Sequence, residues 1–146
     1  TNGGGYPLDK TLYQAIKGSV TAKHLARRGG TVILAAECSE GLGSPEFQKL
    51  VTRLNSAEHY HQLARQPDFF MIDQWMVHEL ANVMLKTDHY IYAPGLPAGV
   101  EKYPIVRRLG SVQEGLDQAL LRHGSQAKVA ILPEGPYIIG VVQPQV

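Results

Sequence analysis

The sequence predicts an α/β fold, with a mainly parallel or mixed β-sheet of about four to six strands flanked by helices. The order of segments along the chain favours this class, and the length and composition bound the number of domains. Short β-branched and apolar runs alternate along the chain with longer segments whose apolar residues recur at helical spacing. The chain has 146 residues, of which 44% are apolar and 18% charged, so we expect a single domain with its own core over residues 1–146.

The first half of the chain is predicted to combine several helices with one strand. Asp9 is a good N-cap, Leu12 and Ile16 form an apolar stripe, and Gly18 is expected to end the first helix. The run 31–36 is β-branched and apolar without alternation, which is typical of a strand covered on both faces. The predicted elements are helices over 9–18 and 20–26, a strand over 31–36, a loop over 37–43, a helix over 45–53 opened by Ser44 and Pro45, and a helix over 56–66.

The second half is predicted to hold two helices and several short strands. Asp73 is expected to cap a helix whose core face includes Met76, Leu80, Val83 and Met84. The remaining predicted elements are strands over 89–93 and 103–109, a helix opened by Ser111 and Glu114 and ended by Gly124, a strand over 128–132, and an extended segment over 137–142 after a turn at 133–136.

Composition narrows the classes of partner and compartment. The chain has 14 Lys and Arg against 13 Asp and Glu, and this balance argues against nucleic acid or an anionic membrane as the main partner. Cys38 is the only cysteine, so a reducing, cytoplasmic compartment is expected. No apolar run approaches the ~20 residues of a membrane span, and residues 1–5 lack the features of a signal peptide. Because the chain starts at Thr1 rather than at Met, we expect it to be a piece of a longer protein.

The first predicted helix carries a polar face with the chemistry to bind an anion. With Leu12 at 0° and about 100° per residue, Ile16 lies at about 40°, Tyr13 at about 100°, Lys17 at about 140° and Gln14 at about 200°. Leu12 and Ile16 therefore face the core, whereas the other three share a face about 100° wide. Their phenol, ammonium and amide groups suit a carboxylate with a neighbouring hydroxyl. From spacing alone, however, an ordinary solvated helix face is the commoner explanation.

Several short motifs of the chain occur together in one known family. The most specific is Tyr6-Pro7-Leu8-Asp9, preceded by Thr1-Asn2-Gly3-Gly4-Gly5 and followed by Tyr13-Gln14-Ala15-Ile16-Lys17-Gly18. The supporting motifs are Ala36-Glu37-Cys38-Ser39-Glu40-Gly41, Asp73-Gln74-Trp75 and Ile131-Leu132-Pro133-Glu134-Gly135-Pro136. Together they span nearly the whole chain and resemble the C-terminal domain of the nickel-dependent lactate racemase family, whose members are 2-hydroxyacid racemases and epimerases.

The resemblance implies an isomerase with two domains and an active site between them, of which this chain is the substrate-side, C-terminal domain. It implies that a nickel-pincer nucleotide and two histidines belong to an N-terminal domain that precedes Thr1, and that the α-hydrogen of a small 2-hydroxy acid moves as a hydride. Lys17 and Gln14 are then expected as catalytic residues, and Tyr13, Gln14, Lys17 and Trp75 as substrate-binding residues. The fragment alone is expected to be inactive and to bind no cofactor or metal.

Other residues have simpler interpretations. The histidines at 24, 59, 61, 78, 89 and 123 are interpreted as surface or structural residues, since no carboxylate completes a metal triad. Cys38 has no basic neighbour in sequence, which indicates a packed thiol. Without the resemblance, Trp75 is interpreted as a packing residue. The loop 37–44 is interpreted as a plain connection between strand and helix.

An alternative function stays open at this point. A loop between a strand and a helix start can receive an anion on free backbone amides, and the loop 37–44 has this position. The chain would then be a non-enzymatic α/β binding module for an anionic ligand. It would also fit an interaction module whose low charge marks a packing surface.

Overall fold

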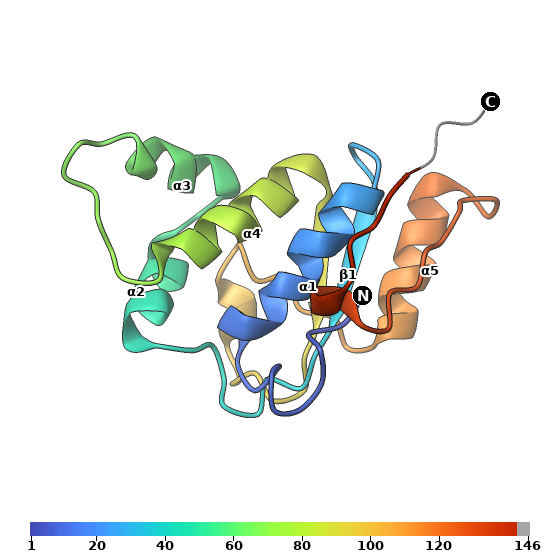
Figure 1. The fold of residues 1–146 in the computed structure, drawn as a ribbon, viewed down its shortest axis with the longest axis horizontal. Coiled ribbons are helices and arrows are strands. Elements are labelled where there is room, and N and C mark those ends of the chain that lie inside the picture. Colours follow the sequence, from blue (N-terminus) through green and yellow to red (C-terminus); the bar gives the residue numbers. More distant parts are fainter. Residues whose placement is uncertain (143–146) are drawn as a thin grey trace.

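A computed structural model describes residues 1–142 and shows one layer of sheet with helices on both sides (Figure 1). Five α-helices, two strands and two short 3-10 helices alternate along this part of the chain. In order they are α1 (Leu12–Leu25), β1 (Thr31–Ala35), α2 (Pro45–Arg53), α3 (Ala57–Ala64), α4 (Gln74–Lys86), β2 (Asp88–Tyr92), η1 (Val100–Lys102), α5 (Val112–His123) and η2 (Gly135–Tyr137).

The sheet is smaller than the sequence predicts. It consists of β1 and β2, which pair in parallel with Thr31 opposite Asp88 and Ala35 opposite Tyr92. A single parallel bridge extends it on each side, from Asn2 to Ala35 and from Ile91 to Arg108. The prediction of an α/β fold is therefore confirmed, but the prediction of about four to six strands is wrong. The reason is that each outer segment turns away from the sheet after only one bridge.

Two predicted strands, 103–109 and 128–132, do not form, and the predicted extended segment 137–142 joins no sheet. The segment 103–109 contributes only the bridge at Arg108. Residues 128–132 form no helix or strand, and in 137–142 the regular structure is limited to Tyr137, the last residue of η2. Near the second of these segments, the Asn2 side chain takes the contacts that a neighbouring strand would supply. Its amide nitrogen donates to the carbonyl of Pro133, and its amide oxygen accepts from the N–H of Gly135 at 3.1 Å. A side chain cannot propagate a ladder as a backbone does.

Helix α1 runs through Gly18 without interruption, so the predicted break between two helices is wrong. A Cβ at Gly18 would lie 1.9 Å from the carbonyl oxygen of Asn2, so glycine here allows the N-terminal segment to approach the helix. The N-cap is Thr11 rather than Asp9. Asp9 is buried, and its carboxylate accepts instead from the N–H of Glu37 at 3.1 Å.

The other helix starts follow the serine signals closely. Ser44, Ser56 and Ser111 each accept a hydrogen bond from the backbone N–H three residues later, as N-caps do. Asp73 occupies the cap position of α4 but makes no capping bond and has a left-handed backbone, with φ at 65°. The predicted capping role of Asp73 is therefore wrong.

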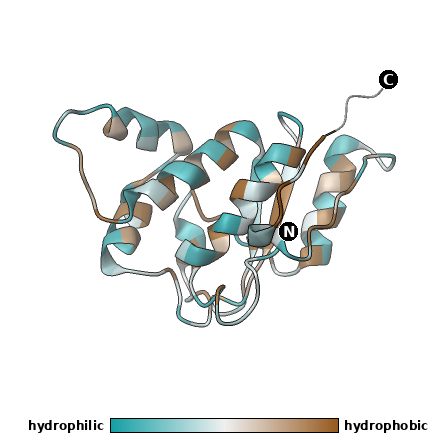
Figure 2. Ribbon diagram, viewed as in Figure 1, coloured by the Kyte–Doolittle hydropathy of each residue, from teal (hydrophilic) through white to brown (hydrophobic). Residues whose placement is uncertain are grey.

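The main core lies between the sheet and helices α1, α2 and α4. Leu34 and Ile91 from the strands meet Leu12 and Ile16 of α1 and Leu80 of α4, all fully buried. In Figure 2 the helices alternate hydrophobic and hydrophilic residues along their length, as expected for helices packed on one side. The core therefore fixes α1 and α4 side by side on one face of the sheet.

The opposite face of the sheet is covered less completely. Helix α5 packs on β1, where Ile33 approaches Gly115 and the Thr31 hydroxyl lies 2.9 Å from a ring nitrogen of His123. Among the residues of α5, Gly115 is buried while Leu121 is 90% exposed. The run 31–35 consequently alternates in burial, rather than being buried on both faces as predicted. None of the helices described within residues 1–142 has the length and hydropathy needed to cross a membrane.

Candidate functional site

The N-terminal end of α1 is held by the loop that follows β1. The N–H groups of Leu12 and Tyr13 donate to the carbonyls of Gly41 and Leu42, at 2.9 and 3.0 Å. Gly43 then passes close to Tyr13, since a Cβ at Gly43 would lie 2.9 Å from the Cβ of Tyr13. These contacts fix the direction of the first helical turn, which carries the predicted polar face.

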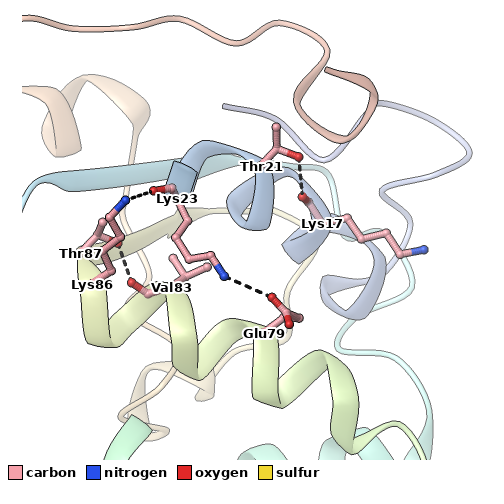
Figure 3. A network of polar contacts seen from close by, with 7 residues as sticks. All are labelled: Lys17, Thr21, Lys23, Glu79, Val83, Lys86 and Thr87. Carbon is pink, nitrogen blue, oxygen red and sulfur yellow. Dashed lines mark hydrogen bonds and ion pairs between the residues drawn. The ribbon is translucent and has the colours of Figure 1, made fainter. Parts of the chain in front are cut away.

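Lys17 and Gln14 form a pair on this face. The Lys17 ammonium donates to the Gln14 side-chain oxygen at 2.5 Å, and both residues are half-buried. In Figure 3 the Lys17 side chain extends away from the polar contacts that join α1 to α4. None of the ion pairs found within residues 1–142 involves Lys17. Its hydrogen bond to a neutral amide therefore leaves the positive charge uncompensated in the described part of the chain.

Tyr13 and Trp75 form a second pair, which joins α1 to the first turn of α4. The indole N–H donates to the Tyr13 hydroxyl at 2.6 Å, and the two rings meet edge to face with centroids 6.3 Å apart. Phe47 of α2 contacts the other side of Tyr13 edge-on at 5.3 Å. Burial raises the pKa of the Tyr13 phenol, and the nearby Asp73 carboxylate adds to this effect although the Trp75 N–H opposes it. The phenol therefore stays protonated at neutral pH.

All four predicted site residues thus lie at one end of the α1–α4 pair. They are joined two by two, and Tyr13 and Lys17 lie four residues apart on α1, which places them one turn apart on the same side of the helix, so the pairs lie next to each other. Trp75 is 52% exposed and the other three are half-buried, so the group opens to solvent rather than lying within the core. The arrangement fits the contact of an external anion.

Known proteins match the chain over almost its full length. The profile of a family described as "Lactate racemase C-terminal domain" matches residues 1–142. The chain belongs to the lactate racemase C-terminal domain family.

Two curated relatives are similar to this chain. A lactate racemase from Lactiplantibacillus plantarum is 29% identical over 95% of the chain and 32% of its own length. One from Thermoanaerobacterium thermosaccharolyticum is 26% identical over 95% of the chain and 33% of its own length. The solved lactate racemase apoprotein from the latter organism has a TM-score of 0.80 and 26% identity, covering 94% of the chain and 34% of that protein. The chain therefore spans about a third of these relatives.

In the loop 37–44, four of the eight backbone N–H groups are bonded within the domain. The N–H groups of Glu37, Cys38, Glu40 and Gly41 already donate to oxygens of Asp9, Lys10 or the loop itself, at 2.7–3.1 Å. Cys38 is fully buried, and burial beside the Asp9 and Glu37 carboxylates raises its thiol pKa to about 12. The loop supports the start of α1, as a plain connection would, and Cys38 is a packed thiol.

One of the six histidines is a core residue. His89 is 1% exposed, and its ring nitrogen lies 2.8 Å from the Ser19 hydroxyl of α1. Burial, with contributions from Arg107 and the N-terminal amine, lowers the His89 pKa to about 3. Within residues 1–142, no group of three or more His, Cys, Asp or Glu side chains is arranged to hold a metal ion.

Sequence reasoning did not identify the contact between Ser44 and Asp73. It assigned each to a helix start, but the Ser44 hydroxyl donates to the Asp73 carboxylate and so joins α2 to α4 next to Tyr13. The position of Asp73 two residues before Trp75 indicates that it lies near the predicted site. The spacing of Ser44 and Asp73 in the sequence does not indicate that their side chains meet.

Proposed function

We propose that this domain supplies the substrate-orienting side chains of a 2-hydroxyacid racemase or epimerase. The active site would lie between this domain and an N-terminal domain outside the chain. Membership of the family supports the activity, and the relatives' threefold greater length supports a second domain. The observation that carries the proposal is the uncompensated Lys17 ammonium beside Gln14 and Tyr13 on a solvent-accessible face.

The hydrogen bonds within the group leave hydrogen-bond donors for a ligand. Gln14 uses its oxygen to accept from Lys17, so its NH2 group remains to donate. The Tyr13 oxygen accepts from Trp75, and its O–H has the Asp73 carboxylate as an acceptor within the domain until a ligand competes for it. Lys17 keeps two further N–H groups. The ligand that complements several donors and one positive charge is an anion with several acceptor oxygens, and the carboxylate and hydroxyl of a 2-hydroxy acid meet this description.

The proposed role of these residues is to fix the substrate. A charge-assisted hydrogen bond from Lys17 to the carboxylate contributes about 1.5–3 kcal/mol. Donors from Gln14 and Tyr13 fix the rotation of the carboxylate and the direction of the α-carbon, which is the orientation that a reaction at that carbon requires. Trp75 forms a wall beside Tyr13 that limits access of water to the bound acid.

Among the described residues 1–142, no group of three or more His, Cys, Asp or Glu side chains is placed to hold a metal ion, and Cys38 is a buried thiol whose pKa is raised to about 12. From the family membership we propose that a nickel-pincer nucleotide is held by the N-terminal domain, where it would supply the acceptor for the hydride from the α-carbon. A cytoplasmic location belongs to the same proposal and rests on the single cysteine of the sequence. The proposed partners are the N-terminal domain and the 2-hydroxy acid, with no role for nucleic acid or a membrane.

Racemisation assays on the full-length enzyme and on this chain alone test the proposal. Each protein is given D- or L-lactate and other small 2-hydroxy acids, with cofactor supplied, and the enantiomers are separated by chiral chromatography. The full-length enzyme is expected to interconvert at least one pair of enantiomers, and the chain alone none. Turnover by the chain alone would refute the division between two domains. A loaded full-length enzyme without activity on any 2-hydroxy acid would refute the function.

A further inference from the structure

Asp73 has a backbone conformation that its position at a helix start does not explain. Its φ is 65°, in the left-handed region that residues other than glycine seldom adopt. Such a conformation is strained and persists only where surrounding contacts hold it. Its side chain makes no capping hydrogen bond to α4. The contacts that hold this backbone conformation therefore come from outside its own helix.

The Asp73 carboxylate is bound by the start of α2. The Ser44 oxygen accepts from the N–H of Phe47 at 3.1 Å, while the Ser44 hydroxyl donates to the Asp73 carboxylate. A serine hydroxyl has one proton, so this geometry requires Asp73 to accept. The first turn of α4 is thereby tied to the first turn of α2.

The hydrogen bond between Ser44 and Asp73 lies next to the Tyr13–Trp75 pair. Trp75 follows Asp73 by two residues in the first turn of α4, and Tyr13 packs against Phe47 in the first turn of α2. Asp73 also lies close enough to Tyr13 for its charge to raise the pKa of the phenol, in addition to the larger effect of burial. The phenol and the indole are thus set between two helix starts that the Ser44–Asp73 contact holds together.

We propose that Asp73 is a positioning residue, which through its contact with Ser44 fixes Trp75 and Tyr13 in the geometry that receives the substrate. The inference rests on the proposed function, because it assigns Tyr13 and Trp75 to the substrate site. It adds a residue that does not itself touch the substrate. Its carboxylate accepts from Ser44 at the start of α2 and not from the amides of its own helix.

Two substitutions separate the carboxylate from the backbone conformation. Asp73→Gly accepts a positive φ without strain but removes the side chain, whereas Asp73→Asn tolerates the same φ and keeps an oxygen that accepts from Ser44. Both are made in the full-length enzyme, labelled with 5-fluorotryptophan. Trp75 is the only tryptophan of this chain, and its fluorine resonance is assigned by its loss in Trp75→Phe.

In Asp73→Gly we expect the Trp75 resonance to shift or broaden without substrate, and KM for the hydroxy acid to rise about tenfold with a smaller change in kcat. Asp73→Asn is expected to restore the resonance and to bring KM within about twofold of the parent enzyme. Ser44→Gly, which keeps most of the cap stability of α2, should shift the resonance as Asp73→Gly does, and the double variant should add little.

An unmoved Trp75 resonance in Asp73→Gly, or an unchanged KM in the presence of a moved resonance, would overturn the inference. Failure of Asp73→Asn to restore either quantity would overturn it as well. The resonance is recorded without substrate, so it tests the position of Trp75 independently of turnover. If the parent enzyme is inactive but the expected resonance changes occur, the proposed function is contradicted. The positioning of Trp75 by the contact between Ser44 and Asp73 is then still supported.

Discussion

The two halves of helix α1 carry similar side chains but make different contacts. In the C-terminal half, Lys23 pairs with Glu79 of α4 at 3.3 Å, and its carbonyl accepts from the Lys86 ammonium at 2.7 Å (Figure 3). Ser19 is buried against His89 in the same half. In the N-terminal half, Lys17 reaches only the neutral amide of Gln14. Both halves pack on the core, but the polar side chains of the C-terminal half bond to other elements of the domain, whereas Lys17 and Gln14 in the N-terminal half bond to each other.

This difference separates stability from binding on a single helix. The Lys23 charge is matched by a carboxylate within the fold, so its loss should affect folding more than ligand binding. The Lys17 charge has no such partner in the described residues, so its loss should affect an external anion more than folding. The distinction would be wrong if loss of Lys17 destabilised the fold as loss of Lys23 does, or if loss of Lys23 weakened ligand binding as loss of Lys17 does.

The largest expected effect is that of Lys17→Met in the full-length enzyme. Loss of a charge-assisted hydrogen bond to the substrate should lower kcat/KM by about 10- to 150-fold. The melting temperature should stay within about 1 °C of the parent. Lys23→Met is the matched control on the same helix and should keep kcat/KM within about twofold. Equal losses of activity in both variants would contradict the division of α1 into two functional halves.

The next effect concerns pH and the buried contact of Ser19 with His89. Because the folded His89 pKa is about 3 and the unfolded value about 6.5, the unfolded chain binds one more proton between these values. The free energy of unfolding therefore falls as pH falls through this window, by about 2 kcal/mol between pH 7 and pH 5.

Urea unfolding of the 146-residue chain at pH 7 and pH 5, followed by circular dichroism, measures this loss. His89→Gln should remove most of the pH dependence. His24→Gln, at an exposed position of α1, should leave the dependence as it is. A parent chain of equal stability at both pH values would show that His89 does not stay neutral in the folded state.

A smaller effect is expected for Tyr13→Phe in the full-length enzyme. The variant keeps the edge-to-face contacts with Phe47 and Trp75 but loses the hydroxyl. Since one neutral hydrogen bond contributes about 0.5–1.5 kcal/mol, kcat/KM should fall by about 2- to 12-fold. Steady-state kinetics with the best 2-hydroxy acid measure the loss. An unchanged kcat/KM would show that the Tyr13 hydroxyl does not contribute to substrate binding.

The smallest effect is that of the ion pair between α1 and α4. Both side chains are largely buried, with 15% and 27% of their surface exposed, so Glu79→Gln should lower the free energy of unfolding by about 0.5–1 kcal/mol. Urea unfolding of the chain at low and high salt measures the loss, which should shrink as salt screens the pair in the parent. A loss of kcat/KM in the full-length protein larger than that of Tyr13→Phe would contradict the assignment of this half to stability.

The sequence predicted what depends on local chemistry. Serine at the starts of α2 and α5, the amphipathic faces of α1 and α4, and the shared polar face of Tyr13, Gln14 and Lys17 follow from spacing within one segment. The approach of Trp75 to Tyr13 was expected only through resemblance to a family, since the two residues lie on separate helices. The roles of these side chains in a reaction stay predictions.

What the sequence did not predict depends on contacts between distant segments. Residues 128–132 have the composition of a strand, but a strand forms only where a neighbouring backbone pairs with it. Gly18 looks like a helix end, although it is a point of close approach for Asn2. Asp73 looks like a cap, although its carboxylate accepts from Ser44. In each case the residue type is compatible with two structural roles, and a contact with a residue far away in the sequence determines which role it has.

The close passage of Asn2 over Gly18 also protects the outer side of β1. Thr1 and Gly3 exchange hydrogen bonds with Ala35, which would otherwise present free backbone groups at the border of a two-stranded sheet. Alanine at position 18 favours a helix more than glycine does, yet its methyl group would displace this segment. The uncovered border would then be open to pairing with a second molecule, so a substitution that improves the helix in isolation would favour aggregation of the whole domain.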